Sequence, residues 1–314
     1  MQKFEHADSV TILLGTYNGA SHLAQQLESI AAQSFANWRI LASDDASIDA
    51  TPDILHGFAQ SHPLTCLTGP GQGHVGNFMH LLMALPKGPQ SDTTAVAFSD
   101  QDDIWFPEKL EVALDALATV PADQPALYCS RRIVWTPDDD QRRLSLSYAR
   151  APSFANACVE NIAPGNTIVL NAAAAQLAQT LAPTANDIFA HDWWLYLLIT
   201  GVGGHIIYDP EPQVLYRQHY NNAIGAGEQL GRRLQNKAAV WRGAFADRVG
   251  RNMAAMQKIS QHLTPENQRC LGLMEQARHA PLVRRIALLR QAGVYRQGRV
   301  SGLTFWGAAC LGKV

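Results

Sequence analysis

The stretch that decides the fold reads Thr94-Ala95-Val96-Ala97-Phe98-Ser99-Asp100-Gln101-Asp102-Asp103-Ile104-Trp105. Its apolar first half predicts a buried strand, and the residues after Pro107 predict a helix, so three carboxylates fall where a strand ends. Carboxylates this close repel one another unless a cation or hydrogen-bond donors offset their charge, and oxygen ligands alone suit Mg²⁺ or Mn²⁺. Taken alone, the stretch also fits a solvated loop whose acids cap a helix.

The residues before this stretch alternate between predicted strands and helices. Strands are predicted at 10–15, 38–42, 63–67 and 94–98, and helices at 21–32, after an N-cap at Thr51, and at 77–85. Such alternation predicts an open α/β fold, in which a mostly parallel, Rossmann-like sheet has helices on both faces. Ligands bind these sheets at the carboxyl ends of the strands. Three polar loops fall there, at residues 16–18, 44–45 and 100–102.

Beyond residue 120 the alternation weakens. Strands are predicted at 126–129, 133–135, 166–170, 205–208 and 214–216, and helices at 171–181 and 193–200. The sequence contains no internal repeat, so we expect one domain over residues 1–227.

The composition excludes several classes of protein. With 47% hydrophobic and 17% charged residues, the 314-residue chain is neither disordered nor fibrous. Its five cysteines are scattered and form no C-x-x-C pair, which argues against a disulfide framework or a zinc site and fits a reducing, cytoplasmic compartment. We find no signal-peptide core and no apolar run of about 18 residues, so we expect no membrane span.

The net charge of -2 is the sum of an acidic first region and a basic second region. Residues 1–227 hold 10 Lys and Arg against 23 Asp and Glu, whereas residues 228–314 hold 15 against 4. The second region has a helical apolar stripe (Val240, Trp241, Phe245, Val249, Met253 and Met256). Such a basic helical region either lies peripherally on an anionic membrane, here the cytoplasmic face of the inner membrane, or packs as an accessory bundle.

Three motifs resemble the family 2 glycosyltransferases of the GT-A fold. They are residues 11–19 (TILLGTYNG), 43–51 (SDDASIDAT) and 98–103 (FSDQDD). The form SDQDDIW at 99–105, with Tyr216-Arg217-Gln218-His219 and Asn222, is similar to the rhamnosyltransferase-like branch that builds bacterial surface polysaccharides. One departure is Ala46, where the family usually has glycine, so a positive φ there would be strained.

The resemblance implies a set of donor-binding residues. The nucleotide-sugar would contact Thr16, Tyr17, Asn18, Asp44, Asp45, Asn77 and Asp100. The alternative for Asp44 and Asp45 is a helix-capping turn. The glycines at 71, 73 and 76 spell G-x-G-x-x-G, which we interpret as an accidental match to a dinucleotide fingerprint.

The resemblance also implies metal, catalytic and acceptor residues. Asp102 would bind Mg²⁺ or Mn²⁺, joined by His219, which is otherwise a structural residue, while Asp103 stays unassigned. Asp192 would be the general base of an inverting displacement, unless it only caps its helix. The acceptor side would include Trp105, Gly165, Asn166 and Trp193, and we expect one of Trp193 and Trp194 to face the acceptor and the other the core.

The implied function is transfer of a sugar, with rhamnose as the first candidate, from a nucleotide diphosphate to a glycan or lipid-linked glycan. Within the same family, UDP-glucose or UDP-galactose would be an alternative donor. A protein of another class, a noncatalytic scaffold that binds nucleotide-sugars, would keep the same fold. We expect no nucleic-acid partner.

Overall fold

The computed structural model describes residues 9–87, 94–137, 140–218 and 244–314. Contacts within the chain group it into two compact units. The first comprises Met1–Ser147, Ala163–Pro183 and Gly204–Gly225, and the second Tyr148–Ile162, Thr184–Gly203 and Ala226–Val314. The second unit thus takes two segments from within residues 1–227, and a functional boundary at residue 227 stays a prediction.

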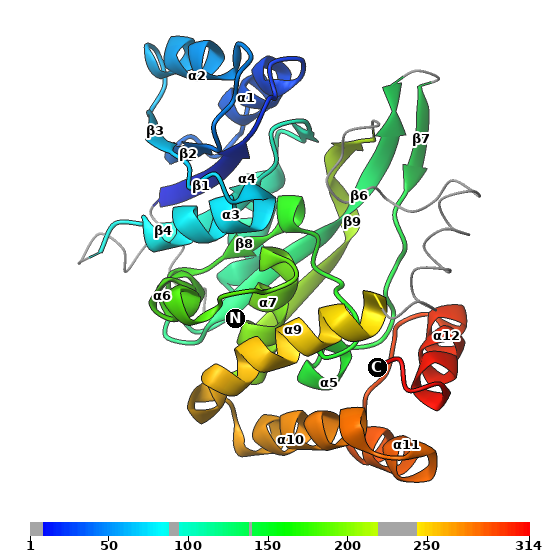
Figure 1. Cartoon of the computed structure of the whole chain (residues 1–314). Coiled ribbons are helices and arrows are strands. Elements are labelled where there is room, and N and C mark those ends of the chain that lie inside the picture. The colour runs from blue at the N-terminus through cyan, green and yellow to red at the C-terminus, as the bar shows by residue number, and fades with distance from the viewer. Residues whose placement is uncertain (1–8, 88–93, 138–139, 219–243) are drawn as a thin grey trace. The chain divides into compact units, whose positions relative to one another are not determined.

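The first unit is built on one sheet, whose strands lie in the order β3-β2-β1-β4-β8-β6-β9-β5, with β7 paired to β6 (Figure 1). The strands are β1 (Ser9–Thr16), β2 (Trp38–Asp44), β3 (Leu64–Thr68), β4 (Thr94–Ser99), β5 (Ile104–Trp105), β6 (Ala126–Thr136), β7 (Gln141–Leu144), β8 (Val169–Leu170) and β9 (His205–Arg217).

The predicted mostly parallel sheet is confirmed in its first half. Strand β1 pairs in parallel with both β2 and β4, and β2 with β3, so their carboxyl ends meet at one edge. In the second half β8 is antiparallel to β4 and β6, while β9 is parallel to β6. The strands predicted at 126–129 and 133–135 form the single strand β6, because bulges near Arg131 carry the ladder past the polar break. Similarly, 205–208 and 214–216 belong to β9 alone.

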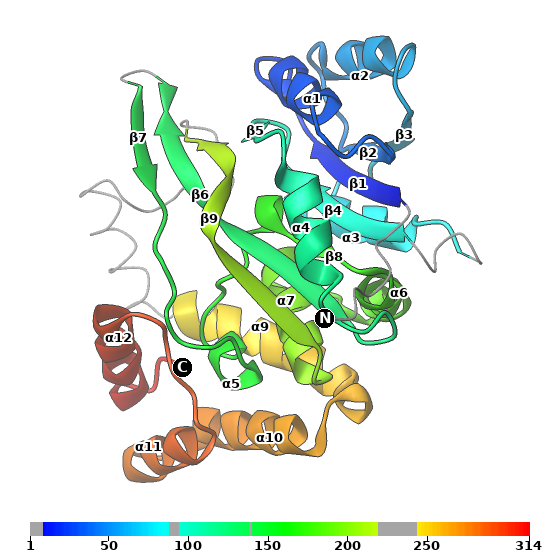
Figure 2. The same cartoon turned by 180° about the vertical axis from the view of Figure 1, so that it is seen from behind.

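Helices pack on both faces of this sheet (Figures 1 and 2). They are α1 (Leu23–Ala31), α2 (Thr51–Ala59), α3 (Gly73–Met83), α4 (Lys109–Leu117) and α6 (Ala172–Leu181). Ile12 of β1 is buried in one cluster with Leu27 of α1 and Leu110 of α4. On the opposite face, Phe78 of α3 lies 5.9 Å from Phe98 of β4, measured between ring centroids.

Two predicted helix starts need correction. Thr51 is the first residue of α2 rather than its N-cap, and its hydroxyl instead accepts a hydrogen bond from Gly19 N at 2.8 Å. Helix α3 begins at Gly73, four residues before the prediction, because the Asp45 carboxylate accepts a hydrogen bond from the Gly73 N–H in its first turn.

The second unit contains the helices α5 (Phe154–Ala157), α7 (His191–Gly201), α9 (Ala244–Lys258), α10 (Pro265–His279), α11 (Leu282–Gln291) and α12 (Arg299–Cys310). The apolar stripe predicted after residue 228 is buried where it is described, at Phe245, Val249, Met253 and Met256 of α9. A Cβ on Gly201 of α7 would meet the Met256 side chain at 3.4 Å, so α9 packs on α7. Val240 and Trp241 lie outside the described residues.

The loop before α12 is tied to the segment that holds α5. Glu160 accepts a hydrogen bond from Gln297 N at 2.6 Å and forms an ion pair with Arg296 at 3.3 Å. The buried Asn156 side chain donates to Tyr295 O at 2.9 Å. The second unit is therefore held together by polar contacts as well as by apolar packing, and the role of residues 228–314 stays a prediction.

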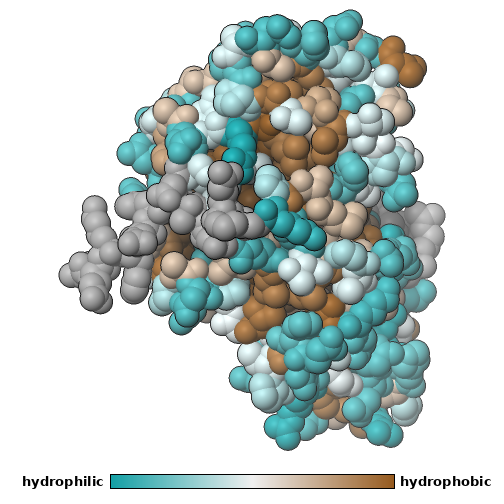
Figure 3. Space-filling view, turned by 90° about the vertical axis from the view of Figure 1, so that its left-hand side faces the viewer, coloured by the Kyte–Doolittle hydropathy of each residue, from teal (hydrophilic) through white to brown (hydrophobic). Residues whose placement is uncertain are grey.

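No helix in the described part of the chain combines the length and the apolar composition that a membrane span requires. On the face drawn in Figure 3, hydrophilic residues surround separate apolar areas.

Candidate functional site

The acidic stretch forms a loop at the carboxyl end of β4. A helix does not follow it directly, because Ile104 and Trp105 first pair with Leu215 and Val214 of β9 as strand β5. The loop is therefore held between two strands of the same sheet. This arrangement fixes the backbone that carries the three carboxylates.

Of the three carboxylates in the acidic loop, that of Asp103 is the buried one. Its side chain is fully buried, and its two oxygens accept hydrogen bonds from Asn166 Nδ2 at 2.6 Å and from Arg217 N at 3.2 Å. Burial, and next the neighbouring Asp102 carboxylate, raise the pKa of Asp103 to about 7. Asp103 therefore joins the acidic loop to β9 and to the 165–167 turn.

Arg217, at the end of β9, is buried and also holds the acidic loop. Its Nε donates to Asp102 O at 2.9 Å, and its guanidinium lies 4.5 Å from the centroid of the Trp135 ring. The guanidinium of Arg132 lies over the Tyr216 ring at 4.0 Å and donates to Asn166 Oδ1 at 3.3 Å. In the sequence, Arg217 has a place in a motif but no assigned role, and Arg132 has neither, because an arginine in a strand carries no signal of its partner.

The three carboxylates of the acidic loop all act on the pKa of Tyr216. The pKa of Tyr216 is raised first by burial and then by the carboxylates of Asp103, Asp100 and Asp102, against the lowering effect of Arg132. The structure thus brings Asp100 and Asp102 to one place. Oxygen ligands from two carboxylates suit a hard divalent cation that keeps further positions for phosphate and water.

The predicted metal site is described only in part. His219 lies outside the described residues. Within the described ranges, no three His, Cys, Asp or Glu side chains gather into a preformed cage for a metal ion. Metal binding by Asp100, Asp102 and His219 therefore stays a prediction.

The loop after β1 is joined to the acidic loop through Gln101. Tyr17 N donates to Gln101 Oε1 at 2.8 Å, and Gln101 Nε2 donates to Tyr17 O at 2.9 Å. A Cβ on Gly19 would lie only 2.2 Å from Gln101 Oε1, so the glycine leaves room for this amide. The Tyr17 side chain is 58% exposed, as a ring that stacks on a nucleotide base would need to be. Gln101 was not predicted as a functional residue.

The loop after β2 is organised by Asp44. Its Oδ1 accepts hydrogen bonds from the Thr16 hydroxyl at 2.8 Å and the Ser47 hydroxyl at 2.6 Å, and its Oδ2 from Ser47 N at 3.0 Å. Asn18 joins the same turn, because Asn18 N donates to Ser47 Oγ and Ile48 N donates to Asn18 Oδ1. The three predicted residues Thr16, Asn18 and Asp44 therefore lie together.

Ala46 adopts the left-handed conformation expected where the family has glycine, with a φ of 68°. A side chain in this region is strained. Alanine in place of the family's glycine at position 46 thus strains the turn that contains Asp44.

Asp45 holds the glycine loop that precedes α3. Its buried carboxylate accepts hydrogen bonds from Gly71 N and from Gly73 N, each at 2.7 Å. Both glycines have positive φ, 67° and 75°, which turns their N–H groups toward the carboxylate. Asn77, one turn into α3, is buried and donates to Ser43 O at 2.8 Å. The first two glycines of the G-x-G-x-x-G spacing thus bind a carboxylate of the chain itself, that of Asp45.

The residues predicted to contact the acceptor differ in their surroundings. Asn166 belongs to the 3-10 turn Gly165–Thr167 and is buried against Asp103. Trp105 is 2% exposed and belongs to the core of the first unit. An acceptor contact of Gly165, Asn166 or Trp105 stays a prediction, and the burial of Trp105 disfavours its contact.

The predicted base and its neighbours belong to the second unit. Asp192 is the second residue of α7, and its Oδ1 accepts a hydrogen bond from Trp193 N at 2.6 Å. Trp193 is 6% exposed and donates from Nε1 to Ala157 O, while Trp194 is fully buried. Both rings are buried, because α7 is buried on nearly all sides, and an acceptor contact of Trp193 stays a prediction.

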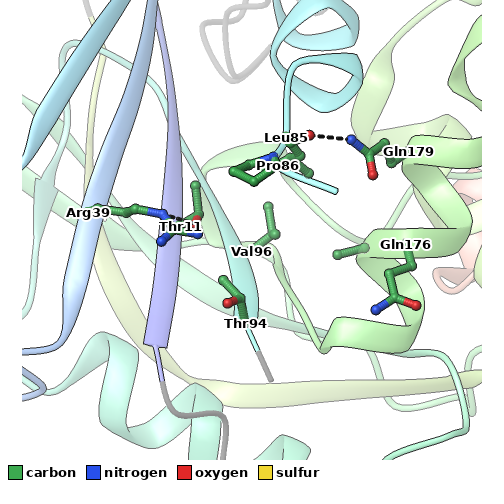
Figure 4. A pocket seen from close by; sticks show the side chains of 9 residues that line it. Thr11, Arg39, Leu85, Pro86, Thr94, Val96, Gln176 and Gln179 are labelled. Carbon is green, nitrogen blue, oxygen red and sulfur yellow. Dashed lines mark hydrogen bonds between the residues drawn. The ribbon is translucent and has the colours of Figure 1, made fainter. Parts of the chain in front are cut away.

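One pocket lies away from these loops, at the amino ends of the first strands (Figure 4). Thr11, Thr94 and Val96 line it together with Gln176 and Gln179 of α6. None of its lining residues belongs to the polar loops at the carboxyl ends of β1, β2 and β4. We therefore do not assign it to the candidate site.

Comparisons with known proteins point to one family. A model described as "Glycosyl transferase family 2" matches residues 11–171. The chain is 31% identical over 227 residues to the dTDP-rhamnosyl transferase RfbG of Shigella flexneri, covering 68% of this chain and 74% of that protein. It is also 26% identical to the uncharacterized protein Rv1520 of Mycobacterium tuberculosis, covering 76% of this chain and 62% of that one.

The structure can be superposed on residues 1–349 of S. aureus TarS with a TM-score of 0.52. The superposition covers 91% of this chain and 92% of that one at 13% sequence identity, so the likeness concerns the fold.

Proposed function

Because the chain belongs to glycosyl transferase family 2 and has the GT-A fold, we propose that it is an inverting, metal-dependent transferase. It moves a sugar, with rhamnose as the first candidate, from a nucleotide diphosphate to a glycan of the bacterial cell surface. The 31% identity to a dTDP-rhamnosyl transferase supports rhamnose ahead of glucose or galactose.

One observation carries the proposal: the loops after β1, β2 and β4 meet at one edge of the sheet and are hydrogen-bonded to one another. Gln101 bonds to the Tyr17 backbone, and Asp44 bonds to Thr16. The edge therefore contains an exposed aromatic residue, Tyr17, in a loop that is joined to the loop of Asp100 and Asp102. This is the chemistry that a nucleotide diphosphate needs, with a flat face for the base and a cation site for the phosphates.

On the donor side, Tyr17 stacks on the base, and Thr16, Asn18, Asp44 and Asp45 shape the pocket around the base and ribose. Asn77 supports this pocket through Ser43, and Asp100 binds the ribose or the cation.

Asp102, with Asp100, would hold Mg²⁺ or Mn²⁺, which neutralises the charge that develops on the departing diphosphate. The Asp102 backbone is held in place by Arg217, and its carboxylate belongs to the group around Tyr216. His219 as a further ligand rests on the resemblance alone.

Asp192 would take the proton from the acceptor hydroxyl as the new glycosidic bond forms. Inversion in one displacement requires one such base. Its place in the first turn of α7 supports the proposal, since the helix N-terminus stabilises a carboxylate in its charged form.

The test is sugar transfer by the purified chain, measured with dTDP-rhamnose, UDP-glucose and UDP-galactose in the presence of Mg²⁺ or Mn²⁺. Asp102→Ala and Asp192→Ala should each abolish turnover while circular dichroism stays unchanged. Asp123→Ala, which removes an exposed carboxylate in the loop before β6, is the matched control and should keep full activity. Full activity of either site variant would refute its assigned role.

The noncatalytic scaffold makes a different prediction in the same experiment. It would bind nucleotide diphosphates in a metal-dependent way, as calorimetry would record, yet turn over no donor with any acceptor. The buried Asp103 and Arg217 network fits either protein, so turnover decides between them.

A further inference from the structure

The surface of the second unit contains a helical face that is apolar where a helix in a water-soluble bundle is normally polar. Helix α12 turns Phe305, Ala308 and Ala309 inward. On its other side, Val300, Leu303, Gly307, Cys310 and the C-cap residue Leu311 form what we call the α12 stripe, with the half-exposed Ser301 and Thr304 beside it. Val300 is 75% exposed, Leu303 74% and Leu311 53%. At 3.6 residues per turn these positions span an arc of about 100°, and none of them is polar or charged.

Exposure of large apolar side chains in the second unit is confined to this end of the chain. Among the described residues of the unit, the exposed ones are Leu282, Val283, Val300, Leu303 and Leu311, all in or directly beside α11 and α12. Helix α9, by contrast, buries its apolar stripe. The exposed apolar residues of the second unit therefore lie on α11 and α12 rather than on the α9 stripe to which the sequence pointed.

The charged residues of the segment that contains α11 and α12 have a single sign. Residues 281–314 contain six Lys and Arg and no Asp or Glu. Two of the six are used internally, since Arg285 donates to Ala309 O and Ala280 O and Arg296 pairs with Glu160. Arg284, Arg290 and Arg299 are exposed, and Arg299 begins α12 itself.

We propose that the α12 stripe is a docking surface for an anionic lipid bilayer, into whose interfacial layer Val300 and Leu303 insert while the exposed arginines contact lipid phosphates. Amphipathic helices with a basic flank bind membranes in this way, through buried apolar area and attraction to anionic head groups. A second copy of the chain is a poorer partner, because two such surfaces would bring arginines against arginines with no acid between them.

The test uses the full chain and co-sedimentation with vesicles of phosphatidylcholine, either pure or mixed with phosphatidylglycerol. The wild type should bind the mixed vesicles, and added salt should weaken the binding. The double variant Val300→Ser with Leu303→Ser should bind at least about tenfold more weakly, a factor that corresponds to about 1.4 kcal/mol. Arg284→Gln, Arg290→Gln and Arg299→Gln together should abolish the preference for phosphatidylglycerol.

The control is Leu146→Ser, which removes a leucine that is 71% exposed in the first unit and should leave vesicle binding unchanged. Circular dichroism and sugar transfer in solution check that each variant folds.

Two results would overturn the proposal. One is failure of the folded wild type to bind mixed vesicles at low salt, or equal binding by the serine double variant. The other is a lipid-free dimer that the serine variant dissociates, with no vesicle binding. Both results concern lipid and not sugar transfer, so they leave the proposed function standing.

Discussion

Replacing Gln101 with alanine should weaken nucleotide binding without unfolding the protein. The Gln101 amide forms two hydrogen bonds with the Tyr17 backbone, at 2.8 and 2.9 Å, and so holds the loop that contains Tyr17 against the acidic loop. Without them, part of the ordering of Tyr17 must occur when the nucleotide binds. Hydrogen bonds of this kind contribute about 0.5–1.5 kcal/mol each, so a loss of about 1–2 kcal/mol, or roughly 5- to 30-fold in affinity, is expected.

The assay is isothermal titration of a nucleoside diphosphate in the presence of Mg²⁺, repeated as a titration of Mg²⁺ with and without nucleotide. If Gln101 couples the two loops, the alanine variant should lose nucleotide affinity and also much of the mutual enhancement between nucleotide and metal. A merely structural role would lower the thermal stability and leave that enhancement unchanged.

Gly19→Ala gives an independent perturbation of the same contact. Its Cβ would lie 2.2 Å from Gln101 Oε1, so the amide must leave its place at Tyr17. The two single variants should therefore resemble each other, and the double variant should be no worse than either. Additive effects, or nucleotide binding by Gln101→Ala within twofold of wild type, would refute the reasoning.

Three further predictions concern stability, measured by urea unfolding. Ala46→Gly should raise the free energy of unfolding by about 0.5–1 kcal/mol. Glycine relieves the strain of a φ of 68°, and this gain exceeds the cost of the greater conformational entropy that glycine gives the unfolded chain. A lower free energy of unfolding would contradict this argument. Asn166→Leu should lower it by about 1–3 kcal/mol, since buried Asp103 loses a donor, and an unchanged midpoint would speak against that network. Burial lowers the pKa of Lys109 from 10.5 to about 7, so between these pH values the unfolded chain holds a proton that the folded chain lacks, and stability rises with pH. Lys109→Met should therefore be more stable than wild type below pH 7 and lose this advantage toward pH 10.5; a constant difference would refute the burial argument.

The sheet could be predicted because its central strands are continuous apolar runs. Strands β1 and β4 are buried on both faces, so their sequences lack the alternation of a half-exposed strand and stand out from the loops. Since parallel strands end at one edge, the neighbourhood of the loops after β1, β2 and β4 followed directly. The extents of β6 and β9 could not be predicted, because a bulge has no pattern of its own in a single sequence.

The division of roles within the site could not be read from the motifs. Asp100, Asp102 and Asp103 are alike in sequence, yet Asp103 is fully buried against Asn166, 63 residues away. Gln101 has no chemistry that marks it as functional, and its partner Tyr17 is 84 residues distant. Contacts at such separations depend on the register of the sheet, which local patterns do not contain.

The two aspartates at the carboxyl end of β2 can be told apart by their burial and by which of their hydrogen bonds can be exchanged for a bond to a ligand. A carboxylate offers about four acceptor sites, of which Asp44 uses three and Asp45 two within the chain. Asp45 is nonetheless only 6% exposed, and freeing it would break two bonds to backbone N–H groups that fix the glycine loop. Asp44 is half-buried, and its bond to the rotatable Ser47 hydroxyl can be exchanged at the cost of one hydrogen bond. This difference favours Asp44 as the residue that accepts hydrogen bonds from the nucleotide, with Asp45 holding the loop beside it.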